Sequence, residues 1–363
     1  MLFGLMTRCW FRTTTIFTIL INLRTCMPHN FSAIFIFGDS LVDVGNNNYI
    51  TTLSKANYKP VGIDFGKPTG RFTNGRTVVD ILGESLGFKS YPPPYLAPST
   101  RGLVVLKGVN YASGASGILD ESGANYIGRI AMDTQLENFA KTRLDIISTI
   151  GAPATVKLFA TSLFTITTGS NDFINNYFQP GLSTLLPPQT FIRTMISTFR
   201  KQLTNLYYMG ARKIVVTNIP PIGCCPYQRD HNPFSGRACV AFPNDLAQQY
   251  NQQLKRLLIE LTKTLKGTTF VYVDIYRMLE DIVKNYESYG FKIADRACCR
   301  MLGIHGGIVP CLQHAKICED RSKYVFWDWF HVTEATNVII AKRILDGEIN
   351  DISPVNIRAL SQI

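Results

Sequence analysis

Four short, strongly apolar runs most constrain the fold of this 363-residue chain. Residues 33–37 are Ala-Ile-Phe-Ile-Phe, and runs of similar length and character occur at 163–167, 213–217 and 270–274. Apolar runs with little polar alternation are typical of strands that are buried on both faces of a parallel sheet. We therefore predict four central strands at these positions.

Helical patterns separate the predicted strands. In residues 77–86, Val78, Ile81 and Leu82 recur on one helical face. Comparable amphipathic patterns occupy residues 191–209, 245–266 and 332–345. Strands that alternate with helices require crossover connections, so the pattern predicts an α/β fold: a three-layer α/β/α, doubly wound and mostly parallel sheet.

The first 26 residues indicate the compartment. Arg8 and Arg12 precede an apolar stretch at 16–21, which is much shorter than the ~20 apolar residues that a membrane span needs. We interpret residues 1–26 as a secretory signal peptide, with an uncleaved N-terminal segment as the alternative. No small-x-small cleavage site is visible, so the point of cleavage stays open. Because no linker divides the remainder, we expect one domain over residues 27–363. Because the apolar stretch at 16–21 is too short, we also expect no transmembrane span.

The nine cysteines favour the same compartment. Cys9 and Cys26 lie within the expected signal peptide, and the other seven lie between residues 224 and 318. A zinc site that includes His305 and His314 is the alternative, but paired C-x2-C spacing is absent. In an exported protein we expect disulfides, with one of the seven thiols left unpaired. Asn30 begins a glycosylation sequon close to the expected cut, and its use stays open.

The charge of the chain excludes one class of partner. Lys and Arg total 37 against 26 Asp and Glu, which gives a formal net charge of +11. The basic residues are scattered and form no long run, so we expect no nucleic-acid partner. The excess charge is consistent with adhesion to anionic surfaces such as an acidic cell wall.

Candidate catalytic residues follow the predicted strands. In doubly wound sheets, ligands bind beyond the carboxyl ends of the strands, where the strand order reverses. Ser40 follows the first strand in Gly-Asp-Ser-Leu, and Asn171 follows the second in Gly-Ser-Asn-Asp. Between them, residues 108–117 are mostly small and allow close approach of backbone N–H groups to a ligand. These segments are expected to meet at one edge of the sheet.

Ser40 needs a base, and His331 is the best candidate. It is the only one of the five histidines with a carboxylate, Asp328, placed three residues before it and directly before the last predicted helix. One turn can bring that carboxylate to Nδ1, which leaves Nε2 facing the serine. In the alternative interpretation, Asp328 caps a turn and His331 merely begins a helix. The chain lacks the Gly-x-Ser-x-Gly elbow of the usual α/β-hydrolases. It also lacks a P-loop and a Gly-x-Gly-x-x-Gly motif, so nucleotide binding has no support.

These motifs together resemble the four sequence blocks of the plant GDSL esterase/lipase family, within the SGNH hydrolases. The blocks are residues 37–48, the Gly-rich stretch around Gly114, residues 169–172, and Asp328-x-x-His331. The resemblance extends from about residue 33 to 347 and implies the flavodoxin-like SGNH fold. Any one block is a weak signal, whereas four in the right order are specific.

The resemblance implies a role for each matching residue. Ser40 is expected to be the nucleophile, His331 the base and Asp328 its orienting partner. An oxyanion hole is expected from the backbone N–H groups of Ser40 and Gly114 and from the side-chain amide of Asn171. The implied enzyme is a secreted, monomeric serine esterase or lipase of the apoplast or cell wall. It forms an acyl-enzyme and needs no cofactor or metal.

Several alternatives remain open beside this interpretation. The same triad would serve an acyltransferase, and a non-catalytic wall-binding protein would retain the fold. Short acyl esters, lipids, acetylated wall polysaccharides and cutin-like polyesters all present the carbonyl that Ser40 would attack.

The chain also departs from the family pattern. Position 115 is Ala where many relatives have Gly, and Trp329 is expected to pack under the last helix or, alternatively, to line the acyl pocket. Relatives usually lack Cys225, which makes it the candidate for the unpaired thiol. The resemblance then implies a bridge between Cys224 and Cys239 and two more within the last four cysteines, with their pairing open: Cys298, Cys299, Cys311 and Cys318.

Overall fold

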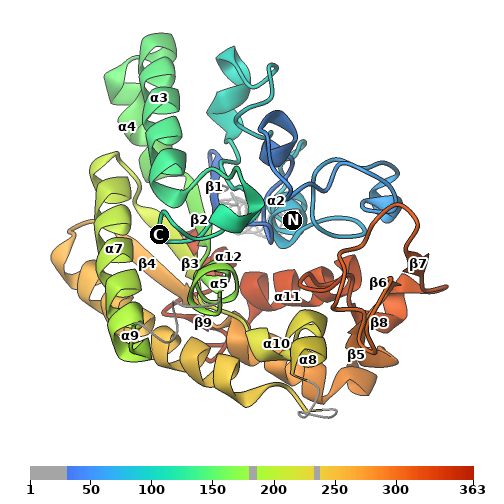
Figure 1. Ribbon diagram of the computed structural model, residues 1–363. Helices are drawn as coiled ribbons and strands as arrows, with labels where there is room; N and C mark the ends of the chain where they lie inside the picture. The colour runs from blue at the N-terminus through green and yellow to red at the C-terminus, as the bar shows by residue number, and fades with distance from the viewer. Residues whose placement is uncertain (1–30, 180–185, 233–237) are drawn as a thin grey trace, which may run out of the picture.

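A five-stranded sheet forms the centre of the protein, seen in a computed structural model that describes residues 31–179, 186–232 and 238–363 (Figure 1). The expected signal peptide and Asn30 lie outside the described residues. Four parallel strands lie in chain order and each falls within one residue of its prediction, followed by a short antiparallel strand at the edge. They are β1 (Ile34–Gly38), β2 (Leu163–Thr167), β3 (Lys213–Thr217), β4 (Thr269–Val273) and β9 (Ile352–Ser353).

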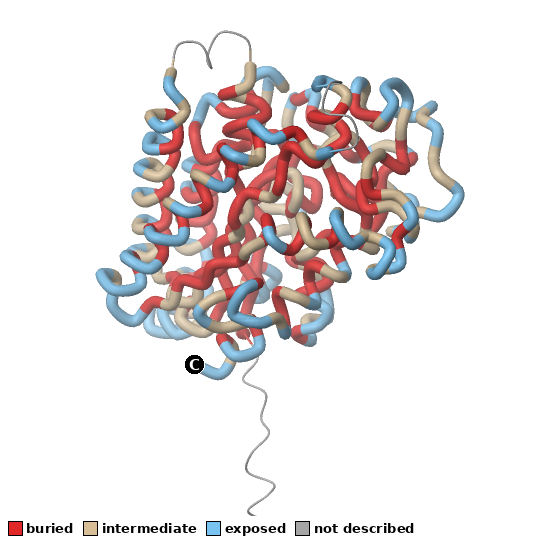
Figure 2. The backbone as a smooth tube through the Cα atoms, turned by 90° about the horizontal axis from the view of Figure 1, so that it is seen from below, coloured by how far each residue is buried: buried red, intermediate tan, exposed pale blue. Residues whose placement is uncertain are grey.

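The strands are buried on both faces, as their composition predicts. Side chains alternate across a strand, so Phe35 and Phe37 enter one hydrophobic cluster while Ile34 and Ile36 enter another on the opposite face. Figure 2 shows buried backbone through the centre of the molecule and exposed backbone mainly at the periphery. The two clusters are the cores of a three-layer α/β/α arrangement, which confirms the predicted fold class.

Helices cover each face of the sheet. The cluster that contains Phe35 is closed by α3 (Met132–Ile150), α4 (Ala152–Ala160), α7 (Pro188–Tyr208) and α9 (Ala241–Thr264). The opposite cluster is closed by α2 (Val78–Ser85), α10 (Ile275–Lys284), α11 (Glu334–Asp346) and α12 (Ile357–Leu360). Among the described residues, no helix is both long and apolar enough to cross a membrane.

The strand order reverses at β1. Residues 109–113 run parallel to the free edge of β1, where Tyr111 N–H donates to the carbonyl of Ile36 at 2.7 Å and Ser113 N–H to that of Gly38 at 3.0 Å. The chain therefore passes from β1 to one side and returns to β2 on the other. The carboxyl end of β1 is the switch point at which doubly wound sheets bind ligands.

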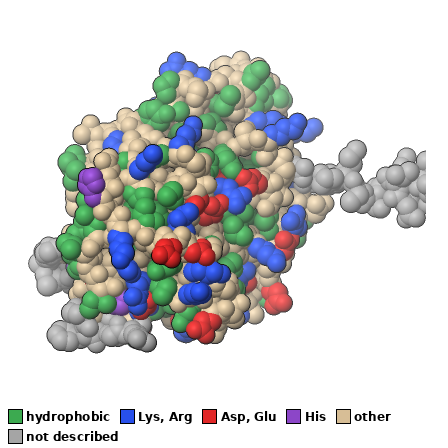
Figure 3. Space-filling model, turned by 90° about the vertical axis from the view of Figure 1, so that its right-hand side faces the viewer, with side chains coloured by type: hydrophobic (Ala, Val, Ile, Leu, Met, Phe, Trp, Pro, Cys, Tyr) green, Lys and Arg blue, Asp and Glu red, His purple; other side chains and the backbone are tan. Residues whose placement is uncertain are grey.

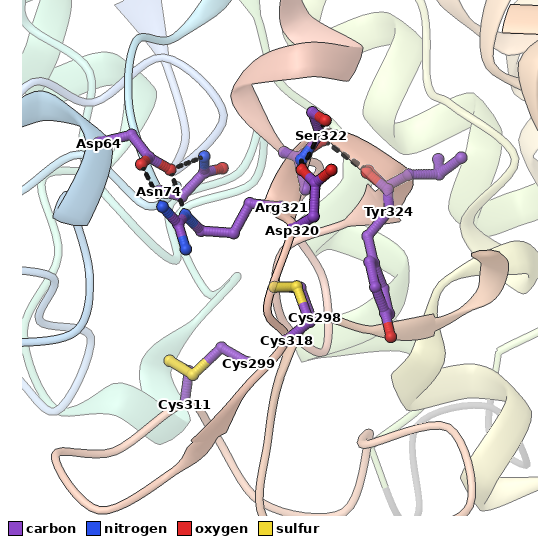
Figure 4. Close-up of a disulfide and its surroundings, with 12 residues drawn as sticks. Asp64, Asn74, Cys298, Cys299, Cys311, Cys318, Asp320, Arg321, Ser322 and Tyr324 are labelled. Carbon is purple, nitrogen blue, oxygen red and sulfur yellow. Dashed lines mark hydrogen bonds and ion pairs between the residues drawn. A yellow bond between two sulfur atoms is a disulfide. The ribbon is translucent and has the colours of Figure 1, made fainter. Parts of the chain in front are cut away.

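Three disulfides link segments near the C-terminal half of the chain. Cys224–Cys239 matches the expected bridge, and Cys225 is the buried free thiol. The other two bridges are Cys298–Cys318 and Cys299–Cys311. Figure 4 shows both beside the strand pairs β6 (Cys299–Arg300) with β7 (Lys316–Ile317) and β5 (Ile293–Ala297) with β8 (Tyr324–Phe326). The structure thus assigns the pairing that the sequence leaves open.

Candidate active site

Ser40 is presented by a tight turn directly after β1. Gly38 has a φ of 144°, and a Cβ at this position would lie 2.0 Å from the carbonyl oxygen of Thr167, so only glycine lets the chain pass β2 here. Asp39 Oδ1 accepts the N–H of Leu41 at 3.0 Å and closes the turn. Gln135 holds Gly38 from behind: its Oε1 accepts the Gly38 N–H, and its Nε2 donates to the Gly38 carbonyl.

Ser40, His331 and Asp328 form an unbroken hydrogen-bonded chain. His331 Nε2 lies 2.8 Å from Ser40 Oγ, and His331 Nδ1 lies 2.8 and 2.9 Å from the two oxygens of Asp328. Asp328 Oδ1 also accepts the backbone N–H of His331 at 2.8 Å, so the carboxylate both caps the turn and orients the ring. This arrangement favours the tautomer with hydrogen on Nδ1, which leaves Nε2 to accept the serine proton.

The histidine is also positioned by packing. Both His331 and Asp328 are more than nine-tenths buried, and the ring of Phe72 lies 5.2 Å from the imidazole, centroid to centroid. Burial strengthens the interaction between the carboxylate and an imidazolium, because fewer waters screen it.

Asn171 lies beyond the carboxyl end of β2, in the short helix α5 (Ser170–Asp172). Its Oδ1 accepts a hydrogen bond from Asn175 Nδ2 at 2.6 Å, and its Nδ2 donates to the carbonyl of Ser116 at 2.9 Å. These two bonds determine which way the amide faces and use one of its two hydrogens. The second hydrogen is left for a ligand in the cavity that Asn171 lines.

Gly114 is not brought to this cavity. Its N–H donates to Asp43 Oδ2 at 3.1 Å, and the residue is not part of the cavity wall. The next residue, Ala115, does line the cavity and has a left-handed φ of 71°. Within the described parts of the chain, the N–H groups of Ala115 and Ser40 have no hydrogen-bond acceptor. The expected contribution of Gly114 therefore does not fit this geometry, because its N–H is already used by Asp43.

The cavity in front of Ser40 has a volume of about 480 Å³ and a mostly apolar wall. Trp329 belongs to this wall and packs on Tyr227 and Phe330. The alternative interpretation, in which Trp329 lines the pocket, therefore fits the structure better than packing under the last helix. The apolar wall comes from segments far apart in sequence and includes Leu41, Leu53, Ala56, Val61, Phe72, Ile174, Pro220, Ile222, Leu279, Pro310 and Leu312.

Burial changes the protonation of groups around the site. It raises the pKa of Asp39 to about 7, although the Leu41 N–H and the nearby His331 act in the opposite direction. Burial likewise raises the pKa of Asp43 to about 6, against four backbone N–H donors, and that of the Cys225 thiol to about 12. Cys225 lines the cavity but stays a neutral thiol near neutral pH, which makes it a poor nucleophile.

Comparison with known proteins decides the family. The family model of the GDSL-like lipases and acylhydrolases matches residues 34–344. The chain belongs to this family. It is therefore a carboxylic ester hydrolase of the GDSL type.

Two plant relatives agree with this assignment. GDSL esterase/lipase At4g16230 of Arabidopsis thaliana is 58% identical over 333 residues, which cover 91% of this chain and 90% of the relative. GDSL esterase/lipase At2g23540 of the same plant is 50% identical over 337 residues, covering 90% and 87%. Among solved structures, a catalytic mutant of an acetylxylan esterase from Geobacillus stearothermophilus is similar at 13% identity and a TM-score of 0.40, covering 87% of this chain and 94% of that one.

Three residues of this GDSL site were missed from the sequence. Asn175 orients Asn171, Phe72 packs on His331, and Ala115 presents a free N–H. Asn175 carried a usable signal, because it lies four residues after Asn171 and hence on the same helical face. No sequence signal indicated Phe72 or Ala115. The position of Phe72 depends on tertiary packing, and that of the Ala115 N–H depends on a backbone angle.

Proposed function

We propose that this protein is a secreted serine esterase that acts through an acyl-enzyme formed on Ser40. The observation that carries the proposal is the hydrogen-bonded chain from Ser40 through His331 to Asp328 at the wall of an apolar cavity. A serine hydroxyl is a weak nucleophile alone, and the adjacent neutral imidazole is the group that activates it.

The proposed reaction has two halves. Ser40 Oγ attacks the ester carbonyl carbon while its proton passes to His331 Nε2. The bond to the alcohol oxygen then breaks, and the alcohol leaves with that proton. In the second half, water gives a proton to His331 and attacks the acyl-enzyme, which releases the acid and regenerates Ser40. Asp328 stabilises the imidazolium that forms in each half.

The negative charge on the carbonyl oxygen needs donors, and three are available. We assign them to the N–H groups of Ser40 and Ala115 and to the second hydrogen of the Asn171 amide. Support comes from the lack of an acceptor for either N–H among the described residues and from the amide orientation that Asn175 and Ser116 maintain. A neutral amide donates without competing with His331 for the serine proton.

Other features of the chain support export and a single domain. Six cysteines are bridged in pairs, which favours an oxidising compartment such as the apoplast or cell wall. We propose that residues 1–26 direct secretion and that residues 27–363 form one monomeric domain. The apolar wall of the cavity favours esters with an apolar acyl group over acetyl esters.

A fluorophosphonate probe tests the assignment of the nucleophile. The wild type is expected to be labelled, whereas Ser40→Ala is not and loses ester hydrolysis. Ser148→Ala is a matched control, because Ser148 is an exposed serine on α3. Labelling of Ser40→Ala to the same extent as the wild type would remove Ser40 from its role. No labelling of the folded wild type would instead favour a non-catalytic binding protein.

A product assay separates hydrolysis from acyl transfer, which would use the same triad. The enzyme is incubated with an acyl ester, with and without an acceptor alcohol. We expect free acid to be the main product in both reactions. A new ester that replaces the acid when the alcohol is present would identify the protein as an acyltransferase.

A further inference from the structure

Five aliphatic side chains are exposed on one loop, residues 301–312, which we call the 301–312 loop. Single exposed apolar residues are ordinary on protein surfaces, but a cluster of this density marks an interaction site. The exposed side chains belong to Met301, Leu302, Ile304, Ile308 and Leu312.

The fold holds this loop in place. The Cys299–Cys311 disulfide closes its base, and the carboxylate of Asp230 accepts the N–H groups of His305 at 3.0 Å and Gly307 at 2.7 Å. Figure 4 shows the bridge at the start of the loop, beside the second disulfide. The disulfide and the Asp230 bonds restrain the loop backbone, which holds its aliphatic side chains at the surface. Their exposure is therefore built into the structure.

The loop leads directly to the active site. Pro310, Cys311 and Leu312 form part of the wall of the cavity that contains Ser40. Leu53 is also a wall residue of this cavity and is 68% exposed. Leu312 and Leu53 therefore connect the apolar outer surface to the apolar interior of the cavity.

The charge around the loop indicates what covers it. Residues 299–318 contain Arg300 and Lys316 and no acidic residue, while the exposed Glu319 and Asp320 follow directly and the Asp230 carboxylate is occupied by the loop's own N–H groups. Neither cation forms an ion pair with any of the described residues. Figure 3, which views the molecule from the side where β6 and β7 lie, shows hydrophobic side chains at the surface among lysines and arginines, with acidic side chains also present on this face. Aliphatic side chains beside unpaired cations are the composition that binds a lipid surface with anionic headgroups.

We propose that the 301–312 loop inserts into such a lipid surface and places the mouth of the cavity against it. The ester substrate would then pass from the lipid layer along Leu312 and Leu53 to Ser40 without crossing water. The proposal adds a partner to the proposed function and depends on that function only for the fate of the ester. Binding to the lipid surface does not require catalysis.

Vesicle sedimentation tests the proposal on the mature chain. The vesicles contain either phosphatidylcholine alone or three parts phosphatidylcholine to one part phosphatidylserine. We expect the wild type to bind the mixed vesicles more tightly, with an affinity that falls as salt is added. The double variant Leu302→Ser with Ile304→Ser is expected to bind about tenfold or more weakly, because two aliphatic side chains no longer leave water.

A matched control is available on the opposite side of the molecule. Leu144 on α3 and Val156 on α4 are 59% and 65% exposed, against 59% and 80% for Leu302 and Ile304. Leu144→Ser with Val156→Ser removes similar exposed apolar surface and is expected to bind vesicles like the wild type. Equal loss of binding in both double variants would show that general hydrophobicity, and not this loop, drives the binding.

Hydrolysis of a water-soluble ester separates this proposal from the proposed function. Leu302 and Ile304 lie outside the cavity wall, so their variant should retain wild-type kcat/KM on that ester. Lack of hydrolysis by the wild type would count against the esterase and not against lipid binding. Wild-type protein that stays in the supernatant would overturn the lipid proposal. A wild-type dimer that Leu302→Ser with Ile304→Ser converts to monomer would also overturn it, by assigning the loop to self-association.

Discussion

At the scale of single residues, the two hydrogens of the Asn171 amide have different partners. One is used by the Ser116 carbonyl, which leaves the other for the oxyanion in the proposed reaction. Loss of one such donor typically lowers turnover ~10²–10³-fold. Asn171→Ala should therefore lower kcat by about that factor and change KM little, because the donor acts mainly in the transition state. Steady-state kinetics on a soluble ester measure both constants.

Two further variants show whether the effect belongs to the donor. Asn175→Ala removes the group that orients Asn171 and should reduce kcat less than Asn171→Ala does. Asn285→Ala, at an exposed position, should leave kcat unchanged. Equal kcat values for Asn171→Ala and the wild type would contradict the proposed oxyanion hole.

Asp39 is expected to make stability depend on pH. It is 1% exposed, its Oδ2 has no hydrogen-bond partner among the described residues, and burial raises its pKa from 3.8 to about 7 against the opposing influence of His331. The neighbouring carboxyl of Asp172 raises it further. The folded state thus keeps a proton that the unfolded chain releases near pH 4. This contribution to the free energy of unfolding is full below about pH 4 and is lost as the pH rises through about 7.

Urea unfolding at a series of pH values measures this dependence. Between about pH 4 and pH 7, Asp39→Asn should lose less stability than the wild type, because an amide does not titrate in this range. Asp120→Asn, which changes an exposed carboxyl, should follow the wild-type curve. The same slope for Asp39→Asn and the wild type would show that Asp39 does not take up a proton on folding.

The residues of the site differ in how far the sequence could predict them. Ser40, His331 and Asp328 could be found because a strand end, a three-residue spacing and family motifs all indicate them. The resemblance implied Gly114 as the backbone donor beside Ser40, but the free N–H that joins that of Ser40 in the cavity wall is that of Ala115. The direction of a backbone N–H depends on φ and ψ. The φ of 71° at Ala115 cannot be predicted from the fact that the residue is an alanine.

At the scale of elements, the four central strands could be predicted because burial on both faces requires long apolar runs. Helix α3 was missed because three of its buried positions are polar, Gln135, Asn138 and Thr142, and these interrupt its apolar stripe. Helix α10 was also missed, although Asp274 before it and the spacing of its buried residues were readable signals.

Short elements could not be predicted from local sequence at all. Residues 109–113 join the edge of β1 through a few backbone bonds, and β9 pairs with β4 over two residues. Cys298–Cys318 links the residues that flank the pair β6 and β7, and Cys299–Cys311 ties β6 to the loop before β7. Such elements depend on partners that are distant in the chain, so tertiary contacts and not propensity determine them.

At the scale of the whole molecule, the C-terminal segment tests whether residues 27–363 fold as one unit. β9 completes the sheet at β4, and Ile352, Ile357 and Leu360 are almost fully buried in the core that also contains α11. Arg343 on α11 forms hydrogen bonds to both oxygens of Asp351 at 2.8 and 2.6 Å. The last sixteen residues therefore pack in the same core as β1, the strand that precedes Ser40, and form part of the domain.

Deletion of residues 348–363 should consequently prevent folding of the entire domain. Burial of each aliphatic side chain contributes about 1.5–3 kcal/mol, so the three together contribute an amount comparable to the whole stability of a domain, ~5–15 kcal/mol. Deletion of residues 361–363 alone should preserve a single unfolding transition, because Ser361, Gln362 and Ile363 are mostly exposed. For both deletion variants, near-UV circular dichroism measures the tertiary structure and its unfolding transition, and fluorophosphonate labelling measures whether Ser40 is still reactive. Cooperative unfolding near the wild-type temperature after the longer deletion would show that the C-terminal segment folds apart from the catalytic core.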